Sequence, residues 1–343
     1  MAGGRKKLLG GWSWVLIGLF LLSWTIASWD LPLAQAQGVS ILSEASEKRL
    51  GEQADKQVLQ QFGYYSDPFL QDYINRVGQR IVQVAERRSI SYHFKVVDDP
   101  KENAFALPGG YVYITRGMLA VLNSEAQLAG VLGHEIAHVT QRHGARRMTE
   151  ALGYQVLSMA LAVGGAVAGA GSPAQWAIVS QAIFTNILLG HGLEYELEAD
   201  EKGLYYAWKA GYDAEEAGRF MRGLRQLERL RGAGYHGFGA THPETTLRIL
   251  KIEELSGNLK PKGKDLEIGE DAYKGQLMGL VYGDRKDRQR IRIYSARPGD
   301  TLATISADVL HNPNRALDLA LLNGIDEKDS LRPGQKIKIV IER

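Results

Sequence analysis

The sequence predicts an α+β protein that is mostly helical, with one small sheet and a small separate unit at the C-terminus. Apolar residues recur at helical spacing over long stretches on both sides of residue 90. Two short stretches, 91–97 and 111–114, read as strands, the first by its alternation of polar and apolar residues. A polar stretch at 256–264 then separates these elements from residues 291–341.

Composition and charge exclude several classes of protein. Of the 343 residues, 45% are hydrophobic and 23% are charged, which excludes a mostly disordered chain and a membrane protein with many spans. The 41 basic and 39 acidic residues are nearly balanced, so we expect no nucleic-acid partner. The absence of cysteine excludes disulfides and thiol chemistry. Any metal ion must therefore be bound through nitrogen and oxygen.

Residues 1–36 are predicted to be a signal peptide. Arg5, Lys6 and Lys7 precede an uncharged run of 18 residues from Trp12 to Trp29, and a small-x-small pattern ends at Ala36. Cleavage after Ala36 would release the mature chain. The alternative is an uncleaved N-terminal anchor in the inner membrane, because 18 apolar residues can just span a bilayer. Either way we expect the rest of the chain to be exported.

Helices are predicted before and after the strands. Ser66-Asp67-Pro68 begins a helix that continues towards Ala85, after an earlier helical pattern over 43–62. Ser124 and Gln127 form a capping box for a helix that should continue to His143 and end at Gly144. Two more helices are predicted over 194–210 and 213–232.

The motif His-Glu-x-x-His occurs in the middle of the helix predicted over 124–143. The four-residue spacing puts His134 and His138 on one helix face, where both imidazoles can reach the same ion. Glu135 lies beside them and is placed to take a proton from water as a general base. We therefore predict a catalytic site that binds one Zn²⁺ per chain.

A catalytic zinc site needs a third protein ligand. Gln141 and Gly144 exclude a third histidine at the spacing found in metzincins. A carboxylate from the helix over 194–210 remains, and Glu196 with Asp200 lies on one face of that helix. We assign Glu196 as the ligand and Asp200 as the acceptor that orients a ligand histidine. Glu194 and Glu198 remain alternative ligands.

Four motifs together carry a family resemblance. They are Asn103–Gly110, Ser124–His138, Glu196–Asp200 and Thr241-His242-Pro243. In this order they resemble the HtpX and CaaX-prenyl-protease class of gluzincin zinc metallopeptidases, most of all its exported soluble BepA-like members, over residues 40–255. The resemblance implies a zincin-type fold with zinc bound by His134, His138 and Glu196. It also implies Glu135 as the catalytic base and Asp200 as a support for the zinc ligands.

The resemblance further implies where a substrate binds. Asn103, Ala104, Phe105 and Ala106 would form an exposed edge strand beside the cleft, to which a substrate peptide can add as a further strand. An ordinary strand and hairpin is the alternative. His242 would lie near the metal, either as a donor to the oxyanion or as a fourth ligand that excludes water. The apolar stretch 156–171 would be a packed helix or flap over the cleft, or would contact the envelope membrane.

Residues 291–341 resemble a LysM domain. The resemblance rests on the segments 294–305, 321–325 and 331–339. The pattern of this unit predicts the order strand, helix, helix, strand. Gly299 and Pro333-Gly334 supply the turns that this βααβ order needs. The resemblance implies binding of N-acetylglucosamine units of peptidoglycan. Since this unit contains no tryptophan to stack on a sugar, it could instead only pack on the peptidase or on a partner.

The sequence thus predicts a signal peptide (1–36), a zinc metallopeptidase domain (37–258), a connection (259–290) and a LysM-like domain (291–341). We expect a periplasmic endopeptidase that hydrolyses envelope proteins, such as misfolded or unassembled ones, and that contacts the outer-membrane assembly machinery. The alternative is a chaperone or a scaffold tethered to peptidoglycan, whose metal site is closed and rarely cleaves.

Overall fold

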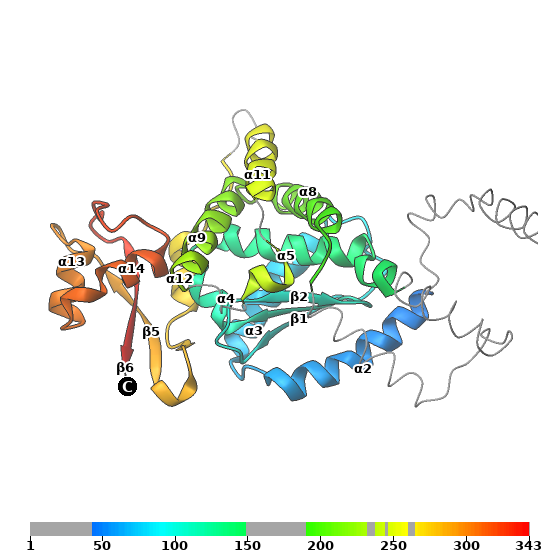
Figure 1. Ribbon diagram of the computed structural model, residues 1–343, viewed down its shortest axis with the longest axis horizontal. Helices are drawn as coiled ribbons and strands as arrows, with labels where there is room; N and C mark the ends of the chain where they lie inside the picture. Colours follow the sequence, from blue (N-terminus) through cyan, green and yellow to red (C-terminus); the bar gives the residue numbers. More distant parts are fainter. Residues whose placement is uncertain (1–42, 149–189, 232–236, 244–245, 260–264, 343) are drawn as a thin grey trace, which may run out of the picture. The chain divides into compact units, whose positions relative to one another are not determined.

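Helices surround a small mixed sheet, as Figure 1 shows for the computed structural model. The structure describes residues 43–148, 190–231, 237–243, 246–259 and 265–342. The predicted signal peptide and the apolar stretch 156–171 lie outside the described residues. No helix in the described part of the chain is both long and apolar enough to cross a membrane. The described residues, from 43 onward, belong to one compact unit.

The first two helices begin at polar caps. Helix α2 (Glu44–Phe62) follows Ser43, whose hydroxyl accepts a hydrogen bond from the Ser46 N–H at 3.2 Å. Helix α3 (Pro68–Val82) follows Asp67, whose carboxylate accepts from the Leu70 N–H at 3.1 Å. Such caps bind the N–H groups that a helix leaves unpaired at its start. Both beginnings agree with the sequence prediction, and α3 ends three residues before Ala85.

Three strands form a sheet in the order β1–β3–β2. Strand β3 (Tyr111–Thr115) lies in the middle, parallel to β1 (His93–Val97) and antiparallel to β2 (Ala104–Leu107). Asn103 thus lies directly before an edge strand that pairs on only one side among the described strands. This is the placement that the resemblance implies for residues 103–106.

The two helices that carry the acidic and histidine motifs are in backbone contact. Helix α5 (Glu125–Thr140) begins at Ser124, whose hydroxyl accepts from the Gln127 N–H at 3.1 Å, as the capping box predicts. It crosses α8 (Leu193–Lys209) where Gly133 meets Gly203. A Cβ atom on Gly203 would lie 2.5 Å from the backbone nitrogen of His134. Only glycine allows this close approach.

Helix α5 ends three residues earlier than the sequence prediction of His143. Arg142 adopts a left-handed conformation, with φ of 59°, and pairs with the buried carboxylate of Glu47. A left-handed residue ends an α-helix. Gly144, the expected end, instead lies inside the next helical segment, 143–148.

Helices α9 (Glu215–Arg231) and α11 (Thr246–Asn258) cover α5 and α8 on the side away from the sheet (Figure 1). The short helix α10 (Phe238–Thr241) instead lies beside the sheet, since its Thr241 hydroxyl donates to the side chain of Asn103, next to β2. On the other side, the short helix α4 (Arg116–Val121) follows directly from β3.

The C-terminal unit has the predicted strand, helix, helix, strand order. Strand β5 (Gln289–Ser295) pairs antiparallel with both β4 (Val281–Tyr282) and β6 (Lys336–Glu342). Between β5 and β6 lie α13 (Leu302–Thr304) and α14 (Ala316–Asn323). Leu302, Leu319 and Ile337 form part of a separate apolar core in this unit.

Buried contacts attach the C-terminal unit to the rest of the chain. The Lys338 amino group donates hydrogen bonds to the carbonyls of Ala120 and Leu122 at 2.6 and 2.7 Å. Helix α12 (Glu270–Gln276) lies in the predicted connection, and its Tyr273 belongs to the main apolar core. The domain limits predicted from the sequence stay a prediction, but this connection contains ordered structure.

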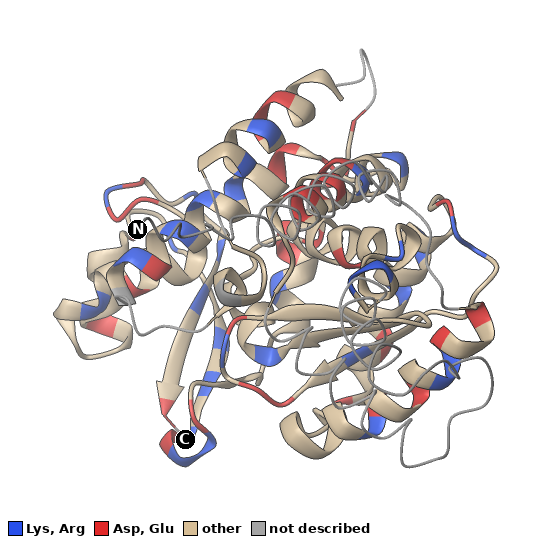
Figure 2. Cartoon of the chain, turned by 45° about the vertical axis from the view of Figure 1, so that its right-hand side comes forward, with Lys and Arg blue, Asp and Glu red and all other residues tan. Residues whose placement is uncertain are grey.

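Charged residues of both signs are interspersed over the described elements (Figure 2). The most consequential charges are those buried between α5, α8 and α11, which belong to the site described next.

Candidate metal centre

Helix α5 places three buried polar side chains towards the centre of the molecule. His134, Glu135 and His138 are each at most 6% exposed. The Nε2 atoms of the two histidines lie 3.0 Å apart. The four-residue spacing therefore brings both imidazoles to one point, as the motif predicts.

Helix α8 contributes Glu196 to this point. One carboxylate oxygen lies 3.4 Å from His134 Nε2, and the other lies 3.6 Å from His138 Nε2. Of the two alternative ligands, Glu194 is exposed, and Glu198 pairs with His143 and Arg146. The structure thus brings Glu196 to the histidines, and neither of the alternatives.

His242 completes the group from the segment that follows α10. Its Nδ1 atom lies 3.3 Å from His134 Nε2 and 3.0 Å from a Glu196 oxygen. Donor atoms of His134, His138, Glu196 and His242 all lie within 4.8 Å of one another. Sequence reasoning placed His242 near the metal and left its role open.

These distances fit a zinc ion. Four ligand atoms around zinc, with bonds of about 2.1 Å, form a tetrahedron whose corners lie roughly 3.4 Å apart. The donor pairs measured above lie 3.0–3.6 Å apart. Three imidazoles and one carboxylate are also donor types that zinc prefers.

The electrostatics of the group favour a cation. Burial opposes ionisation of Glu196, but the charge of His242 and hydrogen bonds from His134 and His242 outweigh it and hold its pKa below the usual range. Burial also opposes protonation of His134, yet hydrogen bonds to Asp200 and Glu196 raise its pKa to about 10. The two carboxylates thus favour a positive charge in this buried site. A metal ion supplies that charge when bound.

A shell of buried partners holds the donors in position. Asp200 accepts from His134 Nδ1 at 2.9 Å, the contact predicted for it. The Arg248 guanidinium binds both oxygens of Asp200, at 2.7 and 2.8 Å, and lies 2.8 Å from a Glu196 oxygen. Arg248 is 1% exposed and therefore fixes both carboxylates of α8 from α11.

The second nitrogen of His138 also has a partner. His138 Nδ1 lies 2.8 Å from His143 Nδ1, and His143 Nε2 lies 3.1 Å from Glu198. The turn at Arg142 makes this contact possible, because it brings His143 back to the end of α5. Burial lowers the pKa of His143 to about 4, although Glu198 opposes the shift. His191 stacks on His138 with ring centroids 4.0 Å apart.

Glu135 is the buried acid that no described donor satisfies. Its carboxylate is fully buried, and neither oxygen has a hydrogen-bond partner among the described residues. His242 Nε2 lies 3.5 Å from one oxygen. Burial raises the pKa of Glu135 above its usual value. A carboxylate with these properties, beside the donor group, is suited to accept a proton from water.

The edge strand β2 contacts this group through its backbone. The Ala104 carbonyl lies 3.2 Å from His242 Nε2, and the Asn103 side chain accepts from the Thr241 hydroxyl at 3.0 Å. Phe105 instead packs on Phe62 and Tyr113 in a second apolar cluster. Ala106 lies with His138 and His191 around a small cavity. Of the residues predicted to bind substrate, Asn103, Ala104 and Ala106 therefore lie close to the donors, and the Phe105 side chain does not.

Sequence reasoning missed three residues of the surrounding shell. Arg248 has no role in the sequence prediction, His143 enters it only as the expected end of a helix, and Glu198 enters it only as an alternative ligand. For His143 and Glu198, position along the chain was a signal of a role in the site. His143 follows the His-Glu-x-x-His motif closely, and Glu198 lies between Glu196 and Asp200. Their contacts depend on the turn at Arg142 and on how α11 crosses α8.

Comparison with known proteins identifies both parts of the chain. The description "Peptidase family M48" matches residues 68–256, and "LysM domain" matches residues 294–340. These matches confirm the predicted resemblance and the α+β class. Together with the donor group they also confirm zinc as the cofactor.

Three curated relatives illustrate the similarity. The "Beta-barrel assembly-enhancing protease" of Escherichia coli K12 is 28% identical over 264 residues, which cover 74% of this chain and 53% of that protein. The "Mitochondrial metalloendopeptidase OMA1" of Schizosaccharomyces pombe is 30% identical over 229 residues, covering 65% of each chain. A "Putative beta-barrel assembly-enhancing protease" of Vibrio cholerae is 35% identical over 163 residues, which cover 46% of this chain and 34% of that protein. The chain spans about half the length of the β-barrel assembly-enhancing protease it matches in E. coli.

Proposed function

Because the chain belongs to peptidase family M48, we propose that it is a zinc-dependent endopeptidase of the bacterial cell envelope. One observation carries this function more than any other. The unpartnered carboxylate of Glu135 lies fully buried beside three donors that fit zinc, His134, His138 and Glu196. Burying such a group without a role would cost stability.

The roles of the residues follow from their positions. Zinc, when bound, polarises the scissile carbonyl and makes water more acidic. Glu135 accepts the proton of the attacking water and delivers it to the leaving amine. Asp200 and Arg248 keep His134 and Glu196 in place, which preserves the geometry between turnovers.

The substrate is proposed to be an extended polypeptide that adds to the edge of the sheet. Strand β2 has a free edge among the described strands, and its residues 103, 104 and 106 lie beside the donors. A peptide that pairs there would be held by main-chain hydrogen bonds, which tolerate many sequences. This suits misfolded or unassembled envelope proteins. The names of the related proteases suggest the β-barrel assembly machinery of the outer membrane as a partner.

The N-terminal and C-terminal segments of the chain both support a location in the periplasm. Residues 1–36 are proposed to direct export to the periplasm, by a cleaved signal peptide or by an anchor. The LysM match supports binding of peptidoglycan through residues 291–341.

A second candidate function is favoured by His242. In this structure its Nδ1 occupies the fourth corner of the donor group, where a catalytic site keeps water or substrate. Its Nε2 contacts the Ala104 carbonyl on the substrate edge. A protein in this closed form would bind polypeptides as a chaperone or a peptidoglycan-tethered scaffold and would rarely cleave them.

Cleavage of casein by the purified mature chain and by His242→Ala tests both functions. If His242 closes the site, the variant cleaves faster than wild type and binds zinc more weakly. If His242 instead donates to the oxyanion, the rate falls roughly 100- to 1,000-fold and zinc affinity is unchanged. In either case a chelator must abolish cleavage and added zinc must restore it. No cleavage by either protein would favour the chaperone or scaffold.

A further inference from the structure

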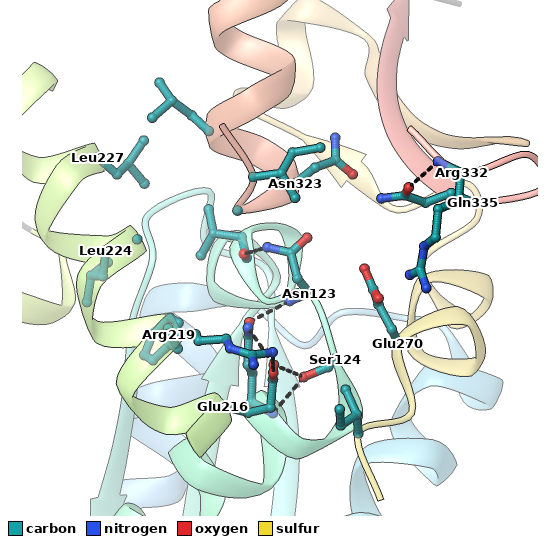
Figure 3. A pocket seen from close by; sticks show the side chains of 18 residues that line it. Asn123, Ser124, Glu216, Arg219, Leu224, Leu227, Glu270, Asn323, Arg332 and Gln335 are labelled. Carbon is teal, nitrogen blue, oxygen red and sulfur yellow. Dashed lines mark hydrogen bonds and ion pairs between the residues drawn. The ribbon is translucent and has the colours of Figure 1, made fainter. Parts of the chain in front are cut away.

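Two buried glutamates from other helices hold the two ends of α5. At the N-terminal end, Glu216 of α9 accepts hydrogen bonds from Ser124 and Gln127 at 2.8 and 3.0 Å, at the wall of a cavity of about 350 Å³ (Figure 3). At the C-terminal end, Glu47 of α2 binds Arg142, two residues after α5 ends. Both contacts therefore act on the helix that carries the metal-binding motif.

The Glu47 carboxylate is buried between two guanidinium groups. It is 1% exposed, and one oxygen accepts a hydrogen bond from Arg142 Nε at 2.6 Å, while the other accepts from Arg87 at 2.9 Å. Arg87 also donates to the Val139 carbonyl in the last turn of α5, at 3.4 Å. Hydrogen bonds between ionised groups are stronger than neutral ones, and a buried carboxylate needs them. Glu47 thus joins the first turn of α2 to the end of α5.

The backbone of Arg142 is in an unfavourable conformation. Its φ of 59° lies in the left-handed region, which only glycine adopts without steric cost. The nearest glycine, Gly144, comes two residues too late to form the turn. Such a conformation persists where the surrounding structure holds it in place. The ion pair between Arg142 and the buried Glu47 supplies this support.

The turn at Arg142 places His143 against a zinc ligand. His143 is fully buried, and its Nδ1 atom lies 2.8 Å from Nδ1 of His138. A partner at the second nitrogen of a ligand histidine fixes the orientation of its ring and raises its affinity for the metal. Glu47 and His138 border the same small cavity, so the beginning and the end of this series of contacts lie close together.

We propose that Glu47 is a positioning residue of the metal centre. By pairing with Arg142 it stabilises the left-handed turn, and the turn holds His143 against His138, which keeps the His138 imidazole directed at the donor group. The inference rests on the proposed function as a zinc-dependent peptidase. It adds α2 to the elements that build the site, although the match to peptidase family M48 begins at residue 68, after α2 has ended.

The zinc affinity of the full mature chain, measured by competition with a chelator, tests the proposal. Glu47→Gln keeps the size of the side chain and removes the charge that binds both guanidinium groups. We expect zinc binding to weaken about tenfold, as on loss of other partners of metal ligands. Glu44→Gln is the matched control, because Glu44 also binds Arg87 from the first turn of α2 but is exposed. It should bind zinc as wild type does.

Two substitutions at Arg142 separate the turn from the ion pair. Arg142→Ala and Arg142→Gly both remove the pair, but only glycine adopts the left-handed conformation freely. We expect Arg142→Ala to weaken zinc binding about tenfold and Arg142→Gly to bind as wild type does. In the Arg142→Gly background, Glu47→Gln should have no further effect on zinc affinity. Urea unfolding of the same variants measures any general loss of stability, which glycine would not reverse.

The outcomes separate this inference from the proposed function. Wild-type zinc affinity in Glu47→Gln or in Arg142→Ala would overturn the role of Glu47. Equal weakening in Arg142→Ala and Arg142→Gly would also overturn it, because the backbone of the turn would then not matter. In these cases zinc-dependent cleavage of casein by wild type would still support the peptidase. No zinc binding by wild type would refute the donor group and the inference together.

Discussion

At the scale of single residues, the donor group is positioned because each donor has a second buried contact. Asp200 holds His134, His143 holds His138, and Arg248 holds Glu196. Such outer contacts fix the orientation of metal ligands and raise their affinity for the ion. The donors are therefore expected to keep their arrangement when zinc is removed.

Zinc content of purified variants tests the assignment of Glu196. Glu196→Ala removes a donor from the group and should lose most of the zinc, whereas Glu194→Ala changes an exposed side chain and should keep it. Asp200→Ala should weaken zinc affinity roughly 10- to 100-fold, because it removes the contact to His134 Nδ1. Elemental analysis decides between these outcomes, and full zinc in Glu196→Ala would refute the assignment.

Much of the candidate site was predictable because it depends on local spacing. The motif at 134–138 and the pair Glu196 and Asp200 each lie on one helix face, and helix geometry is regular. Arg248 could not be predicted from spacing, since its contacts to Glu196 and Asp200 arise only where α11 crosses α8. The same holds for the pair of His138 and His143, which needs the left-handed turn at Arg142.

At the scale of elements, the contact between α5 and α8 sets the distance between the donors. Gly133 and Gly203 let the two backbones touch beside His134, so that Glu196 and Asp200 reach its imidazole from the neighbouring helix. A larger residue at either glycine would push the helices apart. Ala199 and Gly203 lie on one face of α8, and small residues on one helix face favour close packing.

A methyl group at Gly203 therefore probes this contact. The Cβ atom of Gly203→Ala would lie 2.5 Å from the His134 nitrogen, so we expect a loss of stability of about 1–3 kcal/mol and weaker zinc binding. Gly257→Ala, in open space on α11, should not reduce either quantity. Urea unfolding and zinc titration measure the two effects. Unchanged zinc affinity in Gly203→Ala would show that the helix contact does not set the donor geometry.

At the scale of the whole molecule, buried lysines connect the C-terminal unit to the peptidase part. Lys338 is fully buried and donates to two carbonyls at the end of α4, and Lys274 donates to the Lys336 carbonyl at 2.9 Å. The pattern of strands and helices in the sequence was enough to predict the LysM-like unit. It could not predict how the unit docks, because these contacts join residues more than 60 positions apart along the chain.

The pH dependence of stability tests this docking contact. Burial lowers the pKa of Lys338 far below its usual value, whereas in the unfolded chain the amine keeps its proton up to about pH 10.4. Between these two pKa values the unfolded chain binds more protons, so stability rises with pH. The stability of wild type relative to Lys338→Met should therefore be greater at pH 9.5 than at pH 7. Lys328→Met, at an exposed lysine, is the control. If the difference in stability between wild type and Lys338→Met were the same at both pH values, the buried contact would be contradicted.

The most direct test of the central claim is casein hydrolysis by Glu135→Gln, measured in the wild-type chain and in the His242→Ala background. The amide has the shape of the carboxylate but cannot accept the proton of water. Zinc binding and fold should be retained, while hydrolysis should fall about 100-fold or more in whichever background is active. Residual cleavage above about 10% of the parent rate would contradict Glu135 as the general base, because that role supplies roughly 100-fold or more.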